Sequence, residues 1–206
     1  MLTRIYQNYL AERLPPQQVK AWLSKLGYDH RHWTRPVMHE ACTRLLADIG
    51  LSKLDVLEIS AGEHWRSLPF RSFQEMNYPA YDICTDVIKA DVNLIIADQV
   101  FEHLLWPYRA ARNIHSMLPA GGYFLMTTPF LIKYHPIPHD CTRWTETGLK
   151  YFLAEAGFPL DQVVTGSWGN RACVRANFSH WARRGWFGSL KNEPDFPVTV
   201  WALARK

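Results

Sequence analysis

Cysteines and long apolar runs are scarce in this sequence. The chain has 206 residues and four widely spaced cysteines, none of which forms a C-x-x-C pair (Cys42, Cys84, Cys141 and Cys173). This spacing argues against a zinc knuckle and, at this chain length, against a disulfide framework. No apolar run approaches the roughly 20 residues of a membrane span, and the N-terminal residues lack the apolar core of a signal peptide. We therefore expect reduced thiols, a cytoplasmic location and no membrane partner.

Clustered positive charge and phosphate-binding glycine motifs are also missing. The formal net charge is +4, and the basic residues are scattered except for the pair Arg183-Arg184. Nucleic-acid binding usually needs a basic stripe, so we expect no nucleic-acid partner. The sequence lacks G-x-G-x-x-G and G-x-x-x-x-G-K-S/T, which argues against a dinucleotide-binding turn and a P-loop.

The chain does contain enough apolar residues for one core, at 48% of the sequence. We predict a helical N-terminal cap over residues 1–35, followed by an α/β domain over residues 36–206. An excursion at about 166–196, expected to act as a lid, separates two closing strands that pair antiparallel. Predicted strands cover residues 54–60, 72–76, 81–84, 92–97, 123–128, 160–165 and 197–204, and predicted helices cover residues 17–26, 36–49, 107–118 and 145–156.

Polar side chains follow the predicted strand at 92–97. A helix and a second apolar strand come next, which is the order of a parallel sheet. Ligands of such sheets bind in the crevice outside the carboxyl ends of the strands. Asp98, Gln99, Glu102 and His103 are therefore candidate site residues.

An acid and a turn of small residues end the predicted strand at 54–60. Glu58 can accept a hydrogen bond from an ammonium group. Ser60, Ala61 and Gly62 carry little side-chain bulk, which lets a ligand approach the backbone closely. Taken alone, the segment also fits an ordinary tight turn between a strand and a helix.

Four segments, in this order, resemble class I S-adenosylmethionine-dependent methyltransferases. Residues 56–62 match the first motif of that family, residues 93–104 match its D-x-V-x-x-x-x-V-L-E-H segment, and residues 118–122 match its L-x-P-G-G turn. The H-x-x-P-x-D-x-x-R-x-T pattern at 135–145 resembles a subgroup of these enzymes. The resemblance covers roughly residues 37–165. It implies a three-layer Rossmann-like α/β fold, with a mostly parallel seven-stranded sheet and one antiparallel strand.

The resemblance also implies S-adenosyl-L-methionine as the cofactor and assigns residues to it. Glu58 matches the acid that holds the methionine ammonium group, and Asp98 and Gln99 match positions beside the methionine moiety. The remaining cofactor positions are the turn residues Ser60, Ala61 and Gly62, the ribose candidates Glu75 and Asn77, and Asp82 near the adenine amine. The sequence departs from the pattern at Ser60 and His64, where glycines are usual, at Asn93, where an acid is common, and in its short third-strand region.

Three histidines follow the ends of the predicted central strands. Methyl transfer requires an acceptor positioned against the methyl group, and an oxygen acceptor also benefits from a base with a pKa near neutral. His103, His135 and His139 are the candidates, and the loop that holds the latter two is favoured. For each histidine the alternative is a structural ring bonded to a backbone carbonyl.

The loop around these histidines leaves further alternatives open. Arg143 is either a substrate clamp or the partner of Asp140 in a pair that pins the loop. Trp168 either lines an acceptor pocket or serves in plain packing of the cap, and the second is slightly favoured. We expect no metal site, because Pro136 and Pro138 prevent a helical pair of histidine ligands.

These features predict a methyltransferase that modifies a small molecule, with O-methylation of a saccharide or natural-product-like acceptor preferred. No amino-methylation motif of the N/D-P-P-Y/F type is present, which disfavours a protein or nucleic-acid acceptor. The altered first motif leaves open a degenerate fold that serves as a non-catalytic binding or partner subunit. A different cofactor on the same fold and a homodimeric state also stay open.

Overall fold

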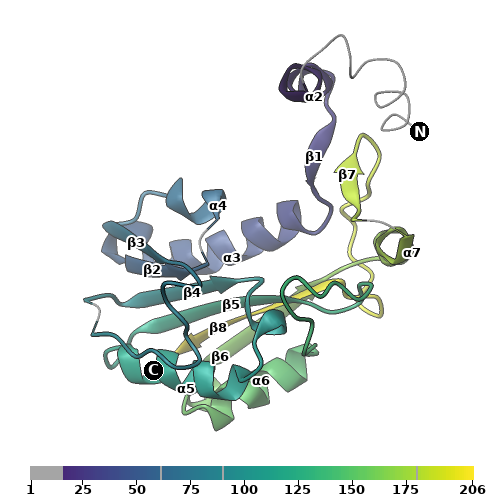
Figure 1. Cartoon of the computed structure of the whole chain (residues 1–206). Helices are drawn as coiled ribbons and strands as arrows, with labels where there is room; N and C mark the ends of the chain where they lie inside the picture. Colours follow the sequence, from purple (N-terminus) through teal and green to yellow (C-terminus); the bar gives the residue numbers. More distant parts are fainter. Residues whose placement is uncertain (1–15, 61, 90, 180) are drawn as a thin grey trace.

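The computed structural model describes residues 16–60, 62–89, 91–179 and 181–206, and its centre is a six-stranded sheet (Figure 1). The strand order is β3-β2-β4-β5-β8-β6, in which β8 runs antiparallel to both neighbours and the other pairs are parallel. The predicted antiparallel pairing of the two closing strands is confirmed. The strands are β2 (Asp55–Ile59), β3 (Ser72–Met76), β4 (Leu94–Asp98), β5 (Tyr123–Pro129), β6 (Val163–Trp168) and β8 (Thr199–Arg205).

Residues 81–84, which we predicted as a strand, form a turn instead. The Asp82 carboxylate accepts a hydrogen bond from the Cys84 N–H at 2.9 Å, and the Asp82 carbonyl accepts from the N–H groups of Thr85 and Asp86. Local bonds of this kind compete with the ladder that a strand would need. Within the described residues the main sheet therefore has six strands rather than the predicted seven.

Helices cover both faces of the sheet and make three layers (Figure 1). On one face lie α3 (Arg35–Ile49) and α4 (Glu63–Arg66), which share a buried cluster with the sheet around Met38 and Trp65. On the other lie α5 (Pro107–Met117) and α6 (Glu146–Glu155), which pack around Phe101 and Ile114. Short 3-10 turns are η2 (Leu51–Lys53), η3 (Phe101–His103) and η4 (Leu160–Gln162).

Local sequence signals explain most of these boundaries. Proline stands in the first turn of α3 and of α5, where its missing N–H costs nothing. Gly50 ends α3 with a φ of 102°, and Thr145 caps α6 by accepting a hydrogen bond from the Gly148 N–H at 3.0 Å. The predicted N-cap at Thr145 is confirmed. Strand β4 is buried on both faces, which explains its continuous apolar run.

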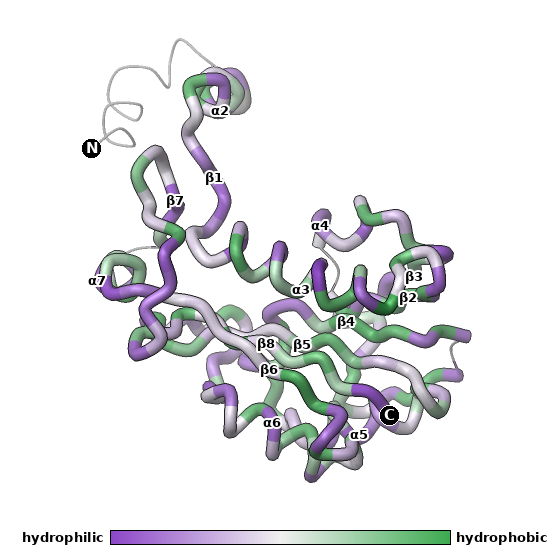
Figure 2. The backbone as a smooth tube through the Cα atoms, turned by 180° about the vertical axis from the view of Figure 1, so that it is seen from behind, coloured by the Kyte–Doolittle hydropathy of each residue, from purple (hydrophilic) through white to green (hydrophobic). Residues whose placement is uncertain are grey.

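A small two-stranded sheet projects from the main sheet (Figures 1 and 2). It pairs β1 (Asp29–His32) antiparallel with β7 (Arg183–Gly185), two segments far apart in the sequence. Helix α2 (Pro16–Lys25) adjoins β1, and α7 (Arg171–Ser179) precedes β7. Residues 16–34 of the predicted cap and residues 171–185 of the excursion therefore form one projecting structure, whereas residues 1–15 of the predicted cap lie outside the described residues. In Figure 2 the main sheet is far more hydrophobic than β1.

The strand order reverses direction between β2 and β4. From β2 the chain moves outward to β3, and from β4 it moves the opposite way to β5. In sheets of this kind, ligands bind at the carboxyl ends of the strands on the two sides of such a switch point, and this edge of the sheet is here called the crevice. Among the described helices, none has the length and apolar character needed to cross a membrane.

Candidate functional site

The chain turns sharply just past β2 and β4, on the two sides of the switch point. Ser60 follows β2 with a φ of 57°, and Gln99 follows β4 with a φ of 60°. Residues other than glycine adopt this left-handed conformation at a cost of about 1 kcal/mol or more, and such strain gathers at functional sites. Ser60 and Gly62 are exposed beside the crevice. Ala61 lies outside the described residues.

Glu58 is a buried acid with half of its carboxylate unpaired. Its side chain is 1% exposed, and Oε1 accepts a hydrogen bond from the Gly62 N–H at 2.9 Å. Oε2 is buried and has no hydrogen-bond partner among the described residues. Burial raises the pKa of Glu58 from 4.5 to about 7, and the nearby negative charge of Asp98 adds to this effect. A cationic group placed at Oε2 would satisfy this oxygen.

Asp98, by contrast, is fully engaged with the protein. Its carboxylate accepts hydrogen bonds from Arg35 Nη1 at 2.7 Å, Trp65 Nε1 at 3.1 Å and Thr127 Oγ1 at 2.5 Å. His39 Nε2 lies 3.1 Å from the same carboxylate. Burial alone would raise the pKa of Asp98, but the bond to His39 and the charge of Arg35 hold it well below its usual range. Asp98 thus links α3, α4 and β5 beneath the crevice.

His64 occupies a position where the resembling family usually has glycine, and it packs against α3. Its ring stacks on His39 with centroids 3.8 Å apart, and Nε2 lies 3.4 Å from Thr43 Oγ1. Burial, with the neighbouring His39, lowers the pKa of His64 to about 4, so the ring is neutral at pH 7. Aromatic contacts therefore hold the turn after β2 in place, at a position where glycine would leave it more flexible.

Of the predicted ribose and adenine residues, Glu75 lies in β3, and Asn77 and Asp82 follow this strand. Glu75 sits beside Glu58 in the strand register and pairs with Arg66 of α4. Asn77 is exposed, and its carbonyl accepts a hydrogen bond from the Tyr81 N–H at 3.1 Å. Asp82 holds its own turn. The first two therefore adjoin the crevice edge nearest β2.

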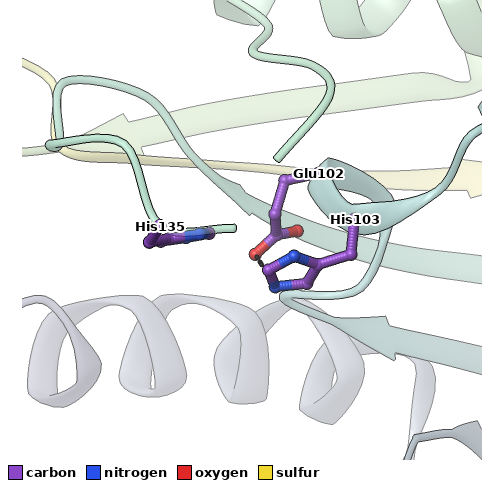
Figure 3. Close-up of side chains that lie close together, drawn as sticks. All are labelled: Glu102, His103 and His135. Atoms are coloured by element: carbon purple, nitrogen blue, oxygen red, sulfur yellow. Dashed lines mark ion pairs between the residues drawn. The ribbon is translucent and has the colours of Figure 1, made fainter. Parts of the chain in front are cut away.

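A second group of polar side chains gathers past β4 and β5 (Figure 3). Glu102 and His103 come from η3, and His135 comes from the loop after β5. Glu102 is 1% exposed, its Oε2 has no hydrogen-bond partner among the described residues, and burial raises its pKa from 4.5 to about 8. The sequence predicted that Glu102 lies near the crevice, but it did not predict that His135 of the loop after β5 lies close to it.

The loop after β5 is pinned from within. Asp140 pairs with Arg143 and accepts a hydrogen bond from the backbone N–H of His135 at 2.9 Å. The backbone N–H of Cys141 donates to the Glu102 carbonyl at 2.8 Å, which ties the loop to η3. The loop-pinning interpretation of Asp140 and Arg143 is what the structure shows. The ring of His139 is exposed, while its carbonyl bonds His103.

Trp168 lies in the core rather than along a cleft. It is 2% exposed, and its Nε1 donates to the Leu190 carbonyl at 3.0 Å. Trp168 thus has a packing role, but it packs in the core of the main sheet and not in the cap as expected. Two open hollows of about 480 and 430 Å³ lie elsewhere, beside Lys20 and Arg31 in the cap and beside Tyr108 on α5. Neither includes the buried acids, whose chemistry makes the β2–β4 edge the better candidate.

Comparison with solved structures relates this architecture to known methyltransferases. An S-adenosylmethionine-dependent methyltransferase from Thermotoga maritima matches with a TM-score of 0.54 and 11% identity, over 98% of this chain and 99% of that one. One from Mesorhizobium loti matches with a TM-score of 0.51 and 13% identity, over 80% and 96% of the two chains.

Haemonchus contortus phosphoethanolamine N-methyltransferase 2, in complex with S-adenosyl-L-methionine, matches with a TM-score of 0.53 and 10% identity, over 80% of this chain and 51% of that one. No family model and no curated protein matches the sequence. At such identities the likeness concerns the fold. The chain thus has the Rossmann-like α/β fold of class I S-adenosylmethionine-dependent methyltransferases, and the predicted fold class is confirmed.

Proposed function

We propose that this protein is an S-adenosylmethionine-dependent methyltransferase that methylates an oxygen of a small saccharide or natural-product-like acceptor. The observation that carries the proposal is Glu58. A buried carboxylate, one oxygen of which has no hydrogen-bond partner in the described part of the chain, lies at the strand-order reversal of a methyltransferase fold. The amino acid portion of S-adenosylmethionine carries an ammonium group, which suits this oxygen electrostatically.

Different residues around Glu58 would bind different parts of the cofactor. Glu58 would bind the ammonium group, and the backbone of Ser60 to Gly62 would pass beneath the cofactor without side-chain bulk. A methyl group built onto Gly62 meets only Glu58 Oε1, at 3.9 Å, so the space above this turn is open. Glu75 and Asn77 are the ribose-hydroxyl candidates, and Asp82 is assigned to the adenine amine. Gln99 would lie beside the methionine moiety, and Asp98 would hold the end of β4 in place next to it.

The cofactor supplies a methyl group made reactive by a positively charged sulfur. The protein must then hold an acceptor in line with that group and remove the acceptor proton. His135 and His103 lie together past β4 and β5, with ring centroids 4.9 Å apart. They are the preferred candidates for the proton acceptor. His139, which the sequence favoured together with His135, is the weaker candidate, because its ring is exposed.

The projecting cap suggests a small acceptor. We infer that residues 1–35 and the excursion at 166–196 act together as a cap and lid, since β1 and β7 pair. Trp181 of the excursion contacts the His135 ring with centroids 5.2 Å apart, which would give the acceptor an apolar wall. Arg143 would orient a substrate indirectly by pinning this loop, and Trp168 would support the wall from the core.

A degenerate, non-catalytic fold is the competing proposal. His64 and Ser60 stand where glycines are usual, and the stacking of His64 on His39 restricts the backbone conformations of the turn after β2. On this view the protein would serve as a binding or partner subunit. The two proposals differ in whether S-adenosylmethionine binds at all.

Calorimetric titration with S-adenosylmethionine tests the proposal. We expect a 1:1 complex, and we expect Glu58→Gln to weaken it by more than about tenfold, because a lost charged hydrogen bond costs roughly 1.5–3 kcal/mol. Glu40→Gln is the matched control, since Glu40 is exposed on α3 and pairs with Arg44 one turn later on the same helix. Absence of binding at about 1 mM ligand would favour the non-catalytic alternative. Equal affinity of Glu58→Gln and wild type would show that Glu58 does not hold the cofactor.

A further inference from the structure

Three potential metal ligands converge beside the proposed acceptor position. One atom from each of Glu102, His103 and His135 lies within 4.8 Å of the other two. Figure 3 shows the Glu102 carboxylate and the His103 ring next to each other, with the His135 ring facing them from the opposite loop. The three side chains come from two separate segments, so the fold itself brings them together.

The tautomer of His103 is fixed by the backbone. Its Nδ1–H donates to the His139 carbonyl at 2.5 Å, which leaves the lone pair on Nε2. Nε2 then lies 3.7 Å from Glu102 Oε1, too far for a hydrogen bond. A backbone carbonyl that orients an imidazole in this way is a common outer-shell partner of metal-binding histidines.

The other two side chains carry buried atoms that make no hydrogen bond within the described residues, although His135 Nδ1 lies 3.9 Å from Asp140 Oδ2. Glu102 Oε2 and His135 Nδ1 have no hydrogen bond to any described residue. Glu102 is 1% exposed, so water reaches its carboxylate poorly. Buried polar atoms are normally satisfied, and two such atoms in one cluster indicate a ligand between them. A cation would satisfy both and would also fill the gap between His103 and Glu102.

We propose that Glu102, His103 and His135 bind one divalent transition-metal ion, with the remaining coordination positions open to oxygen atoms of a ligand. Two imidazoles and one carboxylate suit zinc, iron, manganese or cobalt, whereas magnesium and calcium prefer oxygen ligands throughout. Three protein ligands leave positions free, as in catalytic zinc sites. This departs from the expectation of no metal, which considered only His135, His139, Asp140 and Cys141.

The place of the ion also suggests its ligand. His103 and His135 side chains are 22% and 14% exposed, so the ion would be reachable from the crevice. An acceptor hydroxyl bound to the ion would have a lowered pKa and a fixed position. With the ion bound, His103 and His135 would hold the ion instead of accepting the acceptor proton, because their lone pairs would be used for coordination. This last step rests on the proposed function, whereas the ion-binding site itself does not.

Titration of chelator-treated protein with Co²⁺ and Zn²⁺ tests the site. We expect one tight ion per chain, visible absorption bands for Co²⁺ and a higher melting temperature with Zn²⁺. His135→Asn should weaken binding by more than about 100-fold, beyond the loss typical of an outer-shell change. Glu102→Gln and His103→Asn should act alike. His139→Asn is the control, because its ring is exposed in the same loop and the backbone bond to His103 remains.

The chain has nine histidines, so binding must be assigned by these variants and not by stoichiometry alone. If Glu102→Gln does not fold, His135→Asn decides, since it lies in a surface-facing loop. Failure of the wild type to bind either ion overturns the proposal, as does equal binding by His135→Asn and His139→Asn. Acetohydroxamate, which offers two adjacent oxygen donors, should shift the Co²⁺ bands, and unchanged bands would refute the open positions.

Titration with S-adenosylmethionine in the same preparations separates the two proposals. Ion binding without cofactor binding would retain the metal site and reject the methyltransferase function. Cofactor binding without ion binding would retain the methyltransferase proposal and reject the metal site.

Discussion

Two neighbouring acids, Glu58 and Asp98, show how environment sets the role of a carboxylate. They end adjacent strands, yet burial raises the pKa of Glu58, while hydrogen bonds and a positive charge lower that of Asp98. Asp98 is therefore ionised and structurally committed. Glu58 keeps an oxygen for a ligand.

Glu58 should make the free protein less stable at neutral pH than in mild acid. Its folded pKa lies above the ordinary value, so its stabilising contribution is complete below about 4.5 and is lost as the pH rises to about 7. We expect Glu58→Gln to gain stability relative to wild type over this window by about 1 kcal/mol or more. Urea unfolding at a series of pH values measures the difference. A difference that does not change with pH would contradict the pKa shift.

The sequence identified several site residues but not their partners. Glu58, Asp98 and Glu102 stand out because acids rarely follow buried strands without a reason. Arg35, which binds Asp98 across 63 positions, could not be connected to it from sequence. The one available signal was not used: Arg35 and His39 are four residues apart at the start of a predicted helix, which places both on one side of it.

At the scale of elements, caps and breakers made most helices and strands predictable. Proline at the start, glycine at the end and buried residues at helical spacing located α3, α5 and α6 closely. The strand predicted at residues 81–84 was wrong because the prediction also rested on local composition. The turn at Asp82 has the composition of a short apolar strand.

Thr145 gives a quantitative test of capping in α6. Replacing it with alanine removes the side-chain oxygen that accepts the Gly148 N–H, and we expect a loss of about 1 kcal/mol in the free energy of unfolding. Thr147→Ala, two residues later and exposed, should change stability by less than about 0.5 kcal/mol. Similar losses for the two variants in urea unfolding would refute the cap.

At the scale of the whole molecule, the projecting structure joins distant segments through Asn177. This buried side chain of α7 lies 2.9 Å from His32 Nε2 through Oδ1 and donates to the Cys173 carbonyl at 2.9 Å through Nδ2. The Ala182 N–H also reaches Oδ1, at 3.4 Å. One amide thus connects the cap with the excursion.

Asn177→Ala should loosen this structure without unfolding the main sheet. Loss of a buried hydrogen-bonding group costs about 1–3 kcal/mol. Amide hydrogen exchange should therefore quicken in β1 and β7, while exchange in β4, which is buried on both faces, stays slow. If β4 loses protection equally, the projecting structure unfolds together with the domain and is not a separate unit.

The sequence by itself determined the fold class, most elements and the acids at the strand ends, because periodicity, caps and motif order are local properties of the chain. The tertiary structure decided which of those acids is free. It surrounded Asp98 with partners from three elements, left Glu58 with an unpaired oxygen, and brought His135 to Glu102 and His103. These outcomes depend on packing between segments distant in sequence, where burial and hydrogen bonding are set by three-dimensional proximity.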